Sequence, residues 1–391
     1  MARLDSALAG APVNQIYQGR DGALWLATND NGVWRYIDDR IEHFNMRHGL
    51  GFPIVKSVLE ARDGTLWVGT RNGLSRSDGA PLMISSSRFD NFFGFYTKIV
   101  NIIDRTFTAG HRARDDALWF ATRAGGVVRS DGEHFVQYTT RDGLAHDEVG
   151  AIGEDFQGGL WFGSADGRLT RYDAHSVVNY GPAAGLGAGQ VDALLAAPEG
   201  GLWLGTDQGA WRLRDGVFAA LGQPIPAPRI SALILREGEL WFGVPDGNAW
   251  IYRYDGTTVR LFDFDHIRRL APFQGIIYDL HLAPDGRVWA ASRGGAMYIE
   301  GDAVATEFDS YGMITPYDGL PASPVMAVSG DGDGLLYFGT NSGLVLYDGE
   351  QLAIRTISPP TRAGGAGWPP TGAAWPPSTE KTGAPSTPAT A

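Results

Sequence analysis

The sequence predicts an all-β protein folded as a β-propeller, a ring of small antiparallel sheets called blades. Three observations lead to this prediction. One Trp-centred pattern recurs along the 391-residue chain, and repetition of one such pattern is typical of propellers. Turn pairs such as Asp-Gly separate short apolar segments. These pairs favour tight hairpin turns, because Gly adopts positive φ at no steric cost. Gly (54 residues) and Trp (12) are both abundant, as expected for many short strands joined by tight turns.

The Trp-centred pattern appears first as "DGALWLATNDNGVWR" (21–35) and again as "DGTLWVGTRNGLSR" (63–76). We expect each copy to form one four-stranded blade, so the sequence predicts eight blades, with a seven-bladed ring as the alternative. The aromatic residues of the copies are Trp25, Trp67, Trp119, Trp161, Trp203, Trp241, Trp289 and Tyr337.

Each copy divides into four short extended segments, strands a to d. Strand a is an aliphatic pair separated by two variable residues, as in Val13-x-x-Ile16. In the third copy we expect it at Val100-x-x-Ile103. Strand b carries the Trp, strand c follows a turn that ends in Gly, and strand d completes the sheet. We expect strand a to be innermost, with both variable residues near the central channel.

The recurring Trp is expected to be a core residue. A four-stranded sheet has two apolar faces, and a ring covers both because each blade packs against its neighbours. Burying one Trp is worth roughly 4–6 kcal/mol as an upper bound. A small residue, Gly or Ala, stands two places after the Trp and is expected to let a neighbouring chain segment approach. The last copy ends at a strand d, so closure is expected to rest on side-chain packing between blades one and eight.

The composition changes after Ser358 to Pro, Gly, Ala, Ser and Thr. Segments of this kind do not bury enough apolar surface to fold. We therefore expect a propeller over residues 1–358 and a disordered tail or linker over residues 359–391.

Charge and composition exclude several classes of protein. The net charge of −12 argues against nucleic-acid binding, which depends on basic surfaces. The chain has no Cys, and its eight His residues show no metal-ligand spacing, so neither a metal nor a cofactor is expected. The N-terminus lacks a signal peptide and no apolar run is long enough to span a bilayer. We expect no membrane insertion and, by default, a cytoplasmic location.

Three segments, "DGTLWVGTRNGLSRSDG", "GGLWFGSADGRLTRYD" and "GGLWLGTDQGAWRLRDG", resemble the two-component regulator propeller repeat. The Gly-Leu-x-x-x-x-Val element that precedes this repeat is present as "HGLGFPIV" and "DGLAHDEV". The resemblance covers about residues 10–357 and departs from the pattern at Val244-Pro245 and Tyr337. It implies the sensing part of a hybrid histidine kinase, an extracytoplasmic location as the alternative, and a histidine kinase as signalling partner.

In a propeller, the turns between strands b and c surround the mouth of the channel, which is the default place for a ligand. Arginines come from the turns of blades two, three and seven, and acids from those of blades four, five and six. We therefore expect a cationic and an anionic arc, which favours a polar or zwitterionic ligand. The predicted mouth residues are Arg71, Asn72, Arg123, Asp166, Asp207, Asp246, Arg293 and Asn341.

These features predict a non-catalytic sensing or recognition propeller that binds a small polar ligand, such as a saccharide, or a protein at the mouth. The alternative is a propeller enzyme that acts on carbohydrates, such as a polysaccharide lyase, in which Asp166, Asp207 and Asp246 bind calcium. The fold alone does not decide between them, but the two differ in whether the ligand is consumed.

Overall fold

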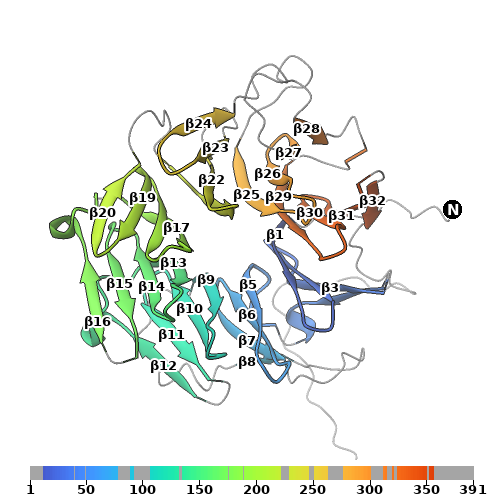
Figure 1. Cartoon of the computed structure of the whole chain (residues 1–391). Helices are drawn as coiled ribbons and strands as arrows, with labels where there is room; N and C mark the ends of the chain where they lie inside the picture. Colours follow the sequence, from blue (N-terminus) through green and yellow to red (C-terminus); the bar gives the residue numbers. More distant parts are fainter. Residues whose placement is uncertain are drawn as a thin grey trace, which may run out of the picture. The chain divides into compact units, whose positions relative to one another are not determined.

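The chain forms eight antiparallel four-stranded sheets, each built from four consecutive strands. Figure 1 shows these sheets as the blades of a ring. The prediction of an eight-bladed β-propeller is therefore confirmed, and the seven-bladed alternative is wrong. The predicted tail (359–391) lies outside the described residues. The computed structural model describes residues 12–38, 40–48, 50–77, 89–91, 106–131, 134–174, 176–187, 189–221, 229–245, 251–262, 276–300, 311–314, 319–320, 324–349 and 352–355.

In every blade, strands a to d follow one another in chain order. Blade one contains β1 (Val13–Gln18), β2 (Leu24–Thr28), β3 (Val33–Ile37) and β4 (Arg40–Phe44). Blade two contains β5 (Val55–Glu60), β6 (Leu66–Thr70), β7 (Gly73–Ser77) and β8 (Phe89–Asn91). Blade three contains β9 (Phe107–Arg112), β10 (Leu118–Thr122), β11 (Val127–Ser130) and β12 (Phe135–Tyr138). Blade four contains β13 (Val149–Glu154), β14 (Leu160–Ser164), β15 (Leu169–Tyr172) and β16 (Val177–Tyr180).

Blades five to eight have the same composition. Blade five contains β17 (Val191–Ala196), β18 (Leu202–Thr206), β19 (Gly209–Arg214) and β20 (Val217–Ala220). Blade six contains β21 (Ala232–Arg236), β22 (Glu239–Gly243), β23 (Ile251–Tyr254) and β24 (Val259–Phe262). Blade seven contains β25 (Ile277–Leu282), β26 (Val288–Ser292), β27 (Gly295–Ile299) and β28 (Tyr311–Ile314). Blade eight contains β29 (Val325–Gly330), β30 (Leu336–Thr340), β31 (Gly343–Tyr347) and β32 (Leu352–Arg355). Short 3-10 helices η1 (Met46–His48), η2 (Thr140–Asp142) and η3 (Pro182–Ala184) lie in connections between blades.

Strand a is the innermost strand, as predicted. Each strand a contacts the strand a of the next blade, and β29 of blade eight contacts β1 of blade one (Figure 1). One cluster of buried residues joins these two blades, with Val13, Leu26 and Trp34 from blade one and Tyr337 and Leu344 from blade eight. The ring therefore closes by side-chain packing between two complete sheets.

Strand a of the third blade differs from the prediction. β9 begins at Phe107 and pairs with β10, so that His111 lies opposite Trp119. The predicted strand at Val100-x-x-Ile103 is therefore wrong, and its residues lie outside the described part of the chain. Phe107 stands twelve residues before Trp119, the spacing of the other copies. An aromatic residue and Gly110 replace the aliphatic pair there, which conceals the repeat.

The small residue two places after the Trp contacts the next blade, as predicted. A Cβ atom added at Gly163 would lie 2.5 Å from Val191 Cγ1, the first side chain of the next strand a. A Cβ atom at Gly339 would lie 2.8 Å from Val13 Cγ1, so the same contact closes the ring between blades eight and one. Atoms do not approach this closely in a packed core, so Gly at these positions lets neighbouring inner strands come together.

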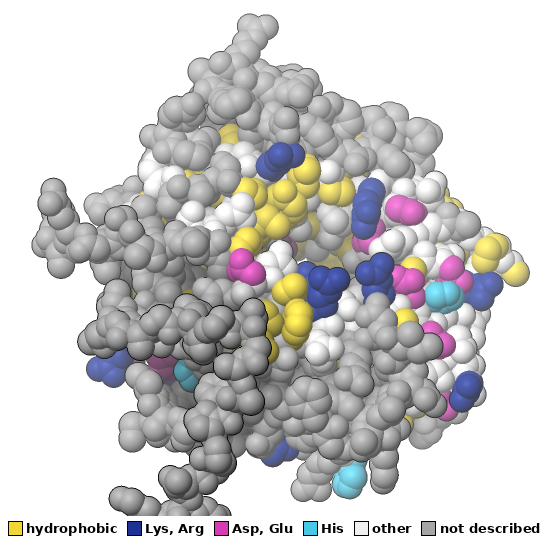
Figure 2. All heavy atoms as spheres, turned by 180° about the vertical axis from the view of Figure 1, so that it is seen from behind, with side chains coloured by type: hydrophobic (Ala, Val, Ile, Leu, Met, Phe, Trp, Pro, Cys, Tyr) yellow, Lys and Arg dark blue, Asp and Glu magenta, His cyan; other side chains and the backbone are white. Residues whose placement is uncertain are grey.

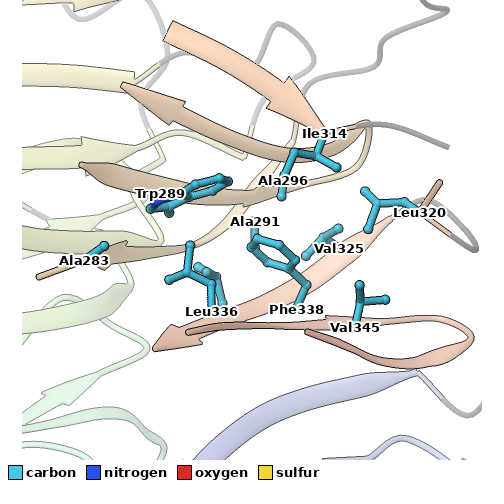
Figure 3. Packing of buried hydrophobic residues seen from close by; sticks show 11 residues of the cluster. Ala283, Trp289, Ala291, Ala296, Ile314, Leu320, Val325, Leu336, Phe338 and Val345 are labelled. Carbon is cyan, nitrogen blue, oxygen red and sulfur yellow. The ribbon is translucent and has the colours of Figure 1, made fainter. Parts of the chain in front are cut away.

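Blade seven shows the same contact with Ala in place of Gly. Ala291 lies in one buried cluster with Val325 of blade eight (Figure 3). Trp289 belongs to this cluster, and its ring centroid lies 5.5 Å from that of Phe338. The Trp therefore fills the space between two blades, as the sequence predicts.

An Arg of strand c lies directly opposite the Trp in six blades. In blade five the Arg212 guanidinium lies 4.9 Å from the centroid of the Trp203 ring. Arg212 also forms an ion pair with Glu199 in the turn between strands a and b. This arrangement explains why the repeat ends in Arg and why its first turn is acidic.

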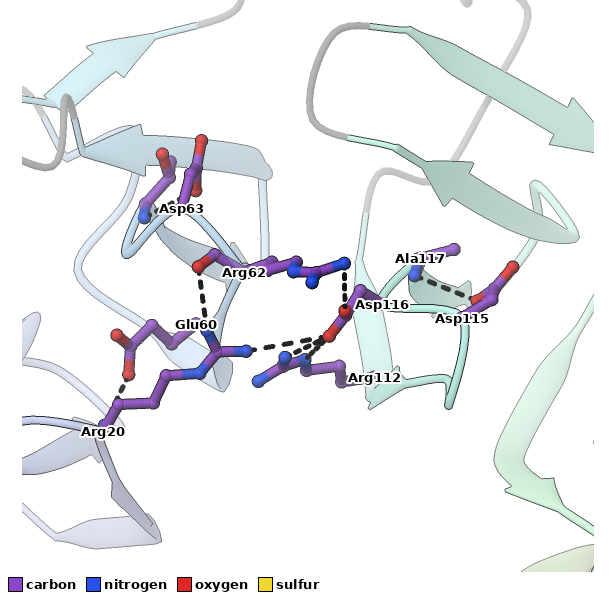
Figure 4. Close-up of polar contacts among 9 residues, drawn as sticks. Arg20, Glu60, Arg62, Asp63, Arg112, Asp115, Asp116 and Ala117 are labelled. Carbon is purple, nitrogen blue, oxygen red and sulfur yellow. Dashed lines mark hydrogen bonds and ion pairs between the residues drawn. The ribbon is translucent and has the colours of Figure 1, made fainter.

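The turns between strands a and b lie at the end of the blades away from the mouth and are linked across blades. Asp116 of blade three lies 3.7 Å from Arg20 of blade one and 3.5 Å from Arg62 of blade two (Figure 4). Arg112 of its own blade also pairs with Asp116. Partly exposed ion pairs contribute about 0–1 kcal/mol each, so this network mainly keeps three neighbouring turns in register.

Enlarging the small residue at the ring closure should destabilise the propeller. Gly339→Val forces its new side chain into Val13, and such overpacking costs about 1–3 kcal/mol. The measurement is the free energy of unfolding in denaturant. Gly332→Val is the control in the same blade, since a Cβ at Gly332 meets no atom within 4 Å. Equal stability of the two variants would contradict the role of this contact in closure.

A partly buried carboxyl between blades seven and eight should make stability depend on pH. Burial raises the pKa of Asp279 to about 6, although the N–H groups of Val328 (3.1 Å) and Leu280 (2.9 Å) donate to it. The unfolded chain loses this proton near pH 3.9, so the folded state binds more protons between about pH 4 and 6 and its stability falls as pH rises through that range.

The stability of Asp279→Asn relative to the wild type should therefore rise by about 1–3 kcal/mol between pH 4.5 and pH 8, on top of a constant cost of replacing one of the two acceptor oxygens. Denaturant unfolding at both pH values measures this difference. The exposed Asp215→Asn serves as the control. A constant difference between wild type and Asp279→Asn across the pH range would contradict the assignment.

Candidate functional site

The turns between strands b and c lie beside the start of the inner strands. In six blades the N–H of the first turn residue donates to the carbonyl just before strand a of the same blade. These turns therefore surround the mouth of the channel. The bonds run from Asn29 to Pro12 (3.0 Å), Arg71 to Ile54 (3.0 Å), Arg123 to Thr106 (2.9 Å), Ala165 to Glu148 (3.1 Å), Asp207 to Gln190 (3.1 Å) and Arg293 to Ile276 (3.0 Å).

A Thr or Ser at the end of strand b fixes the shape of the turn in seven blades. In blade two, Thr70 Oγ1 donates to Gly73 O (2.7 Å) and accepts from Asn72 N (3.2 Å). The same pair of bonds recurs in blades one, three, five, seven and eight. In blade six Val244 takes this position, and Pro245 follows it. The side chains that follow the hydroxyl residue therefore project from defined backbone positions.

The residues predicted for the mouth occupy two successive places in these turns. Asn72 and Asp166 stand one place later than the others, and Asp246 lies outside the described residues. The predicted set is thus not one structural position repeated around the ring. The residues that directly follow the Thr or Ser are Arg71, Arg123, Asp207, Arg293 and Asn341.

Two of the predicted charges already have partners in the protein. Asp166 Oδ1 accepts from Ser164 Oγ (2.7 Å), and Asp166 Oδ2 lies 3.3 Å from Arg168 Nε. Arg123 Nε lies 3.7 Å from Glu148 Oε1. A ligand that binds these groups competes with the existing ion pairs, so it gains less from them.

Strand a adds a second set of residues at the mouth. In seven blades the residue after the first position of strand a is skipped in the pairing with strand b and forms a β-bulge, a device that re-aims a side chain. Together with the matching residue of blade six, these bulge residues are Asn14, Lys56, Thr108, Gly150, Asp192, Ser231, Tyr278 and Met326.

In blades one and seven, the residue after the bulge accepts a hydrogen bond from the backbone of the next blade. Gln15 Oε1 accepts from Val58 N of blade two (2.9 Å), and Asp279 Oδ2 accepts from Val328 N of blade eight (3.1 Å). These side chains join neighbouring inner strands. The first variable residue of strand a is skipped in the pairing with strand b, and the second is paired. The backbone therefore distinguishes two positions that the sequence treats alike.

Two cations of blade two lie together at the mouth. Lys56 is half-buried, and its Nζ donates to Asn29 Oδ1 (3.2 Å). Burial and the nearby Arg71 guanidinium lower the pKa of Lys56. Within the described ranges, no carboxylate forms an ion pair with Lys56 or Arg71. This place carries two positive charges that no carboxylate of the described residues compensates.

Blade five carries two carboxylates. Asp192 Oδ2 lies 3.0 Å from Arg229 Nε, and Asp192 Oδ1 accepts from Gln190 Nε2 (2.9 Å). Burial raises the pKa of Asp192; Arg229 opposes this rise, and the nearby Asp207 carboxylate adds to it. Asp207 Oδ1 is buried and accepts no hydrogen bond from any residue that the structure describes. Among the described residues, the two carboxylates and the one arginine therefore leave one negative charge in excess at this place.

Charged side chains of both signs lie on one face of the molecule. Figure 2 shows basic, acidic and hydrophobic side chains interspersed around the centre of one face. Among the described residues, no three His, Cys, Asp or Glu side chains are placed to hold a metal ion together. The helices of the described segments are all too short or too polar to cross a bilayer.

Lys56 and Asp192 were expected near the channel, as variable residues of strand a, but not among the ligand-binding residues. Both stand at the bulge, where pairing with strand b is interrupted. The available signal was a charged residue directly after the first aliphatic residue of an inner strand. The bulge that makes this position different from its neighbour is a backbone feature, and the repeat pattern does not reveal it.

Comparison with known proteins identifies both the repeat and the fold. Residues 7–30 and 49–72 match the family model of the two-component regulator propeller. No curated protein sequence matches the chain. Among solved structures, the extracellular domain of the hybrid two-component system BT4673 from B. thetaiotaomicron is 18% identical, with a TM-score of 0.52. The match covers 75% of this chain and 38% of that domain, so the chain spans well under half of that protein's length.

Two further structures share the architecture. A catalytically inactive virginiamycin B lyase from Staphylococcus aureus, solved with quinupristin, is 14% identical with a TM-score of 0.53, and the match covers 75% of this chain and 93% of the lyase. The computationally designed protein Ika8 is 12% identical with a TM-score of 0.60, and the match covers 87% of this chain and 98% of Ika8. At this level of identity the similarity shows the fold alone. The chain is therefore an eight-bladed β-propeller that carries two-component regulator propeller repeats.

Proposed function

We propose that this propeller is a recognition domain of a signalling system, which binds a small polar ligand at the channel mouth without transforming it. The observation that carries the proposal is the separation of uncompensated charge there. Lys56 and Arg71 of blade two have no carboxylate partner among the described residues, and Asp192 and Asp207 of blade five have only Arg229 between them. A zwitterionic ligand complements both places.

The repeat family supports a role in signalling. The chain carries the two-component regulator propeller repeat, and a similar fold occurs in the extracellular domain of a hybrid two-component system. We therefore propose a histidine kinase as the signalling partner and an extracytoplasmic location. A protein that docks on the mouth is the alternative partner, and it would be recognised by the same charges.

A propeller lyase is the second candidate function. The observation that favours it is the shared fold with virginiamycin B lyase, whose structure contains quinupristin. A lyase acting on a saccharide differs from a receptor in one measurable respect, because it consumes its ligand.

A ligand screen on the wild type tests the proposal. Amino acids, sugar acids and neutral oligosaccharides are added in a thermal-shift assay, and each hit is recovered and analysed by mass spectrometry. We expect at least one hit, recovered unchanged. A hit converted to product would establish the lyase, and the absence of any hit would favour a protein partner.

The double variant Arg71→Ala/Arg123→Ala should bind the hit about 10²-fold more weakly, since a charge-assisted hydrogen bond contributes about 1.5–3 kcal/mol. Most of this loss should come from Arg71, because Arg123 lies beside Glu148. Isothermal titration calorimetry measures the affinity. Arg214→Ala is the control, as Arg214 lies at the turn after β19 and pairs with Asp215. Equal affinity of the wild type and the double variant would place the ligand elsewhere.

A further inference from the structure

The half-burial of the Lys56 ammonium group destabilises the protein when no ligand balances its charge. Moving a charged group out of water is unfavourable unless an opposite charge or hydrogen bonds replace the water. Lys56 is half-buried. Among the described residues its ammonium group donates one hydrogen bond, to Asn29 Oδ1. Val55 pairs with Thr70 across strands a and b, so Lys56 and Arg71 each follow one residue of this pair, and the Arg71 guanidinium adds repulsion. The protein therefore holds two like charges close together at the mouth.

The neighbouring amides do not compensate these charges, and their orientation is fixed. An ammonium group only donates, so the Asn29 atom that it contacts must be the carbonyl oxygen. The same oxygen accepts from Asn14 Nδ2 (3.0 Å), which also donates to Val55 O (3.1 Å). Two donors thus share the Asn29 oxygen. The NH2 group of the Asn29 side chain is a further donor. Blade two and its neighbour therefore present donors at this place.

The other charged side chain among the bulge residues shows the contrast. Asp192 occupies the same position in blade five as Lys56 in blade two. Asp192, however, is compensated by Arg229 (3.0 Å) and by Gln190 (2.9 Å). Of the two charged side chains at the seven bulges, Lys56 is the one that has no opposite charge among the described residues.

We propose that Lys56 and Arg71 together form an anion seat, in which two acceptor oxygens of an acidic ligand replace the missing partner. This inference rests on the proposed function and narrows it: the ligand is an organic acid, such as a uronic acid, rather than a neutral saccharide. The Arg71 guanidinium offers a planar pair of donors and Lys56 a point charge, so the two bind one anionic group from different directions.

The mouth of the wild type is tested first with three related probes. Glucuronate carries a carboxylate, glucose 6-phosphate a phosphate, and glucose neither. We expect glucuronate to bind at least 10-fold more tightly than glucose in isothermal titration calorimetry. Tighter binding of glucose 6-phosphate would retain the anion seat and assign its ligand to phosphate esters. Equal binding of all three probes would overturn the proposal.

Lys56→Met then separates a binding role from a structural one. If Lys56 is held for a ligand, replacing it with an apolar side chain of similar length removes both the burial cost and the repulsion from Arg71. We expect a higher melting temperature without ligand together with a loss of glucuronate affinity of about 10-fold or more. A lower melting temperature would show that Lys56 serves the fold through Asn29, and it would overturn the proposal.

Two matched variants complete the test. Arg71→Gln should lose glucuronate affinity to a similar extent, whereas Arg214→Gln, at the exposed last residue of β19, should retain it. If glucose or an amine binds and is sensitive to Asp207→Asn but not to Lys56→Met, the anion seat is wrong and the proposed function stands. If no probe and no member of the ligand panel binds the wild type, both fail.

Discussion

The close contact between the small residue on strand b and the first side chain of the next strand a is the constraint on which this ring depends. Gly163 against Val191 and Gly339 against Val13 leave no space for a Cβ atom. Neighbouring inner strands therefore pack tightly, and the bulky Trp of the same strand b fills the space farther out between blades. Because the last blade makes this contact with the first, closure uses the same packing as every other junction, with no strand exchanged between chain ends.

Crowding at the inner strands makes polar groups there informative. A carboxylate or ammonium in this environment needs hydrogen bonds or an opposite charge. Asp279 receives two backbone N–H groups and still has a raised pKa, and Asp192 has Arg229 and Gln190. Lys56 has one amide oxygen and a neighbouring guanidinium. The fold itself provides partners for Asp279 and Asp192. The half-buried charge of Lys56 is explained more simply by the proposed binding of a ligand.

The sequence predicted the architecture well because the architecture repeats. Eight copies of one spacing located the Trp residues, the small residues and the turns, and the exception was blade three, where Phe107 and Gly110 replace the aliphatic pair. The site was predicted less well. Turn positions follow from spacing, so Arg71 and Asp207 were placed at the mouth. Whether a charge is already compensated depends on partners distant in sequence, such as Glu148 for Arg123, and on a bulge in the backbone. Neither leaves a periodic signal.

The rigid backbone of the mouth bears on the proposed recognition of a ligand. Each described turn is closed by a Thr or Ser hydroxyl, and the first residue of most of them is tied by its N–H to the carbonyl before strand a. Residues anchored in this way lose little further freedom on binding, so little affinity is spent on ordering the backbone. Selectivity then depends mainly on charges fixed in place. In the proposed role, the two cations of blade two and the two carboxylates of blade five, which share one arginine among the described residues, would let the mouth distinguish the two ends of a polar ligand.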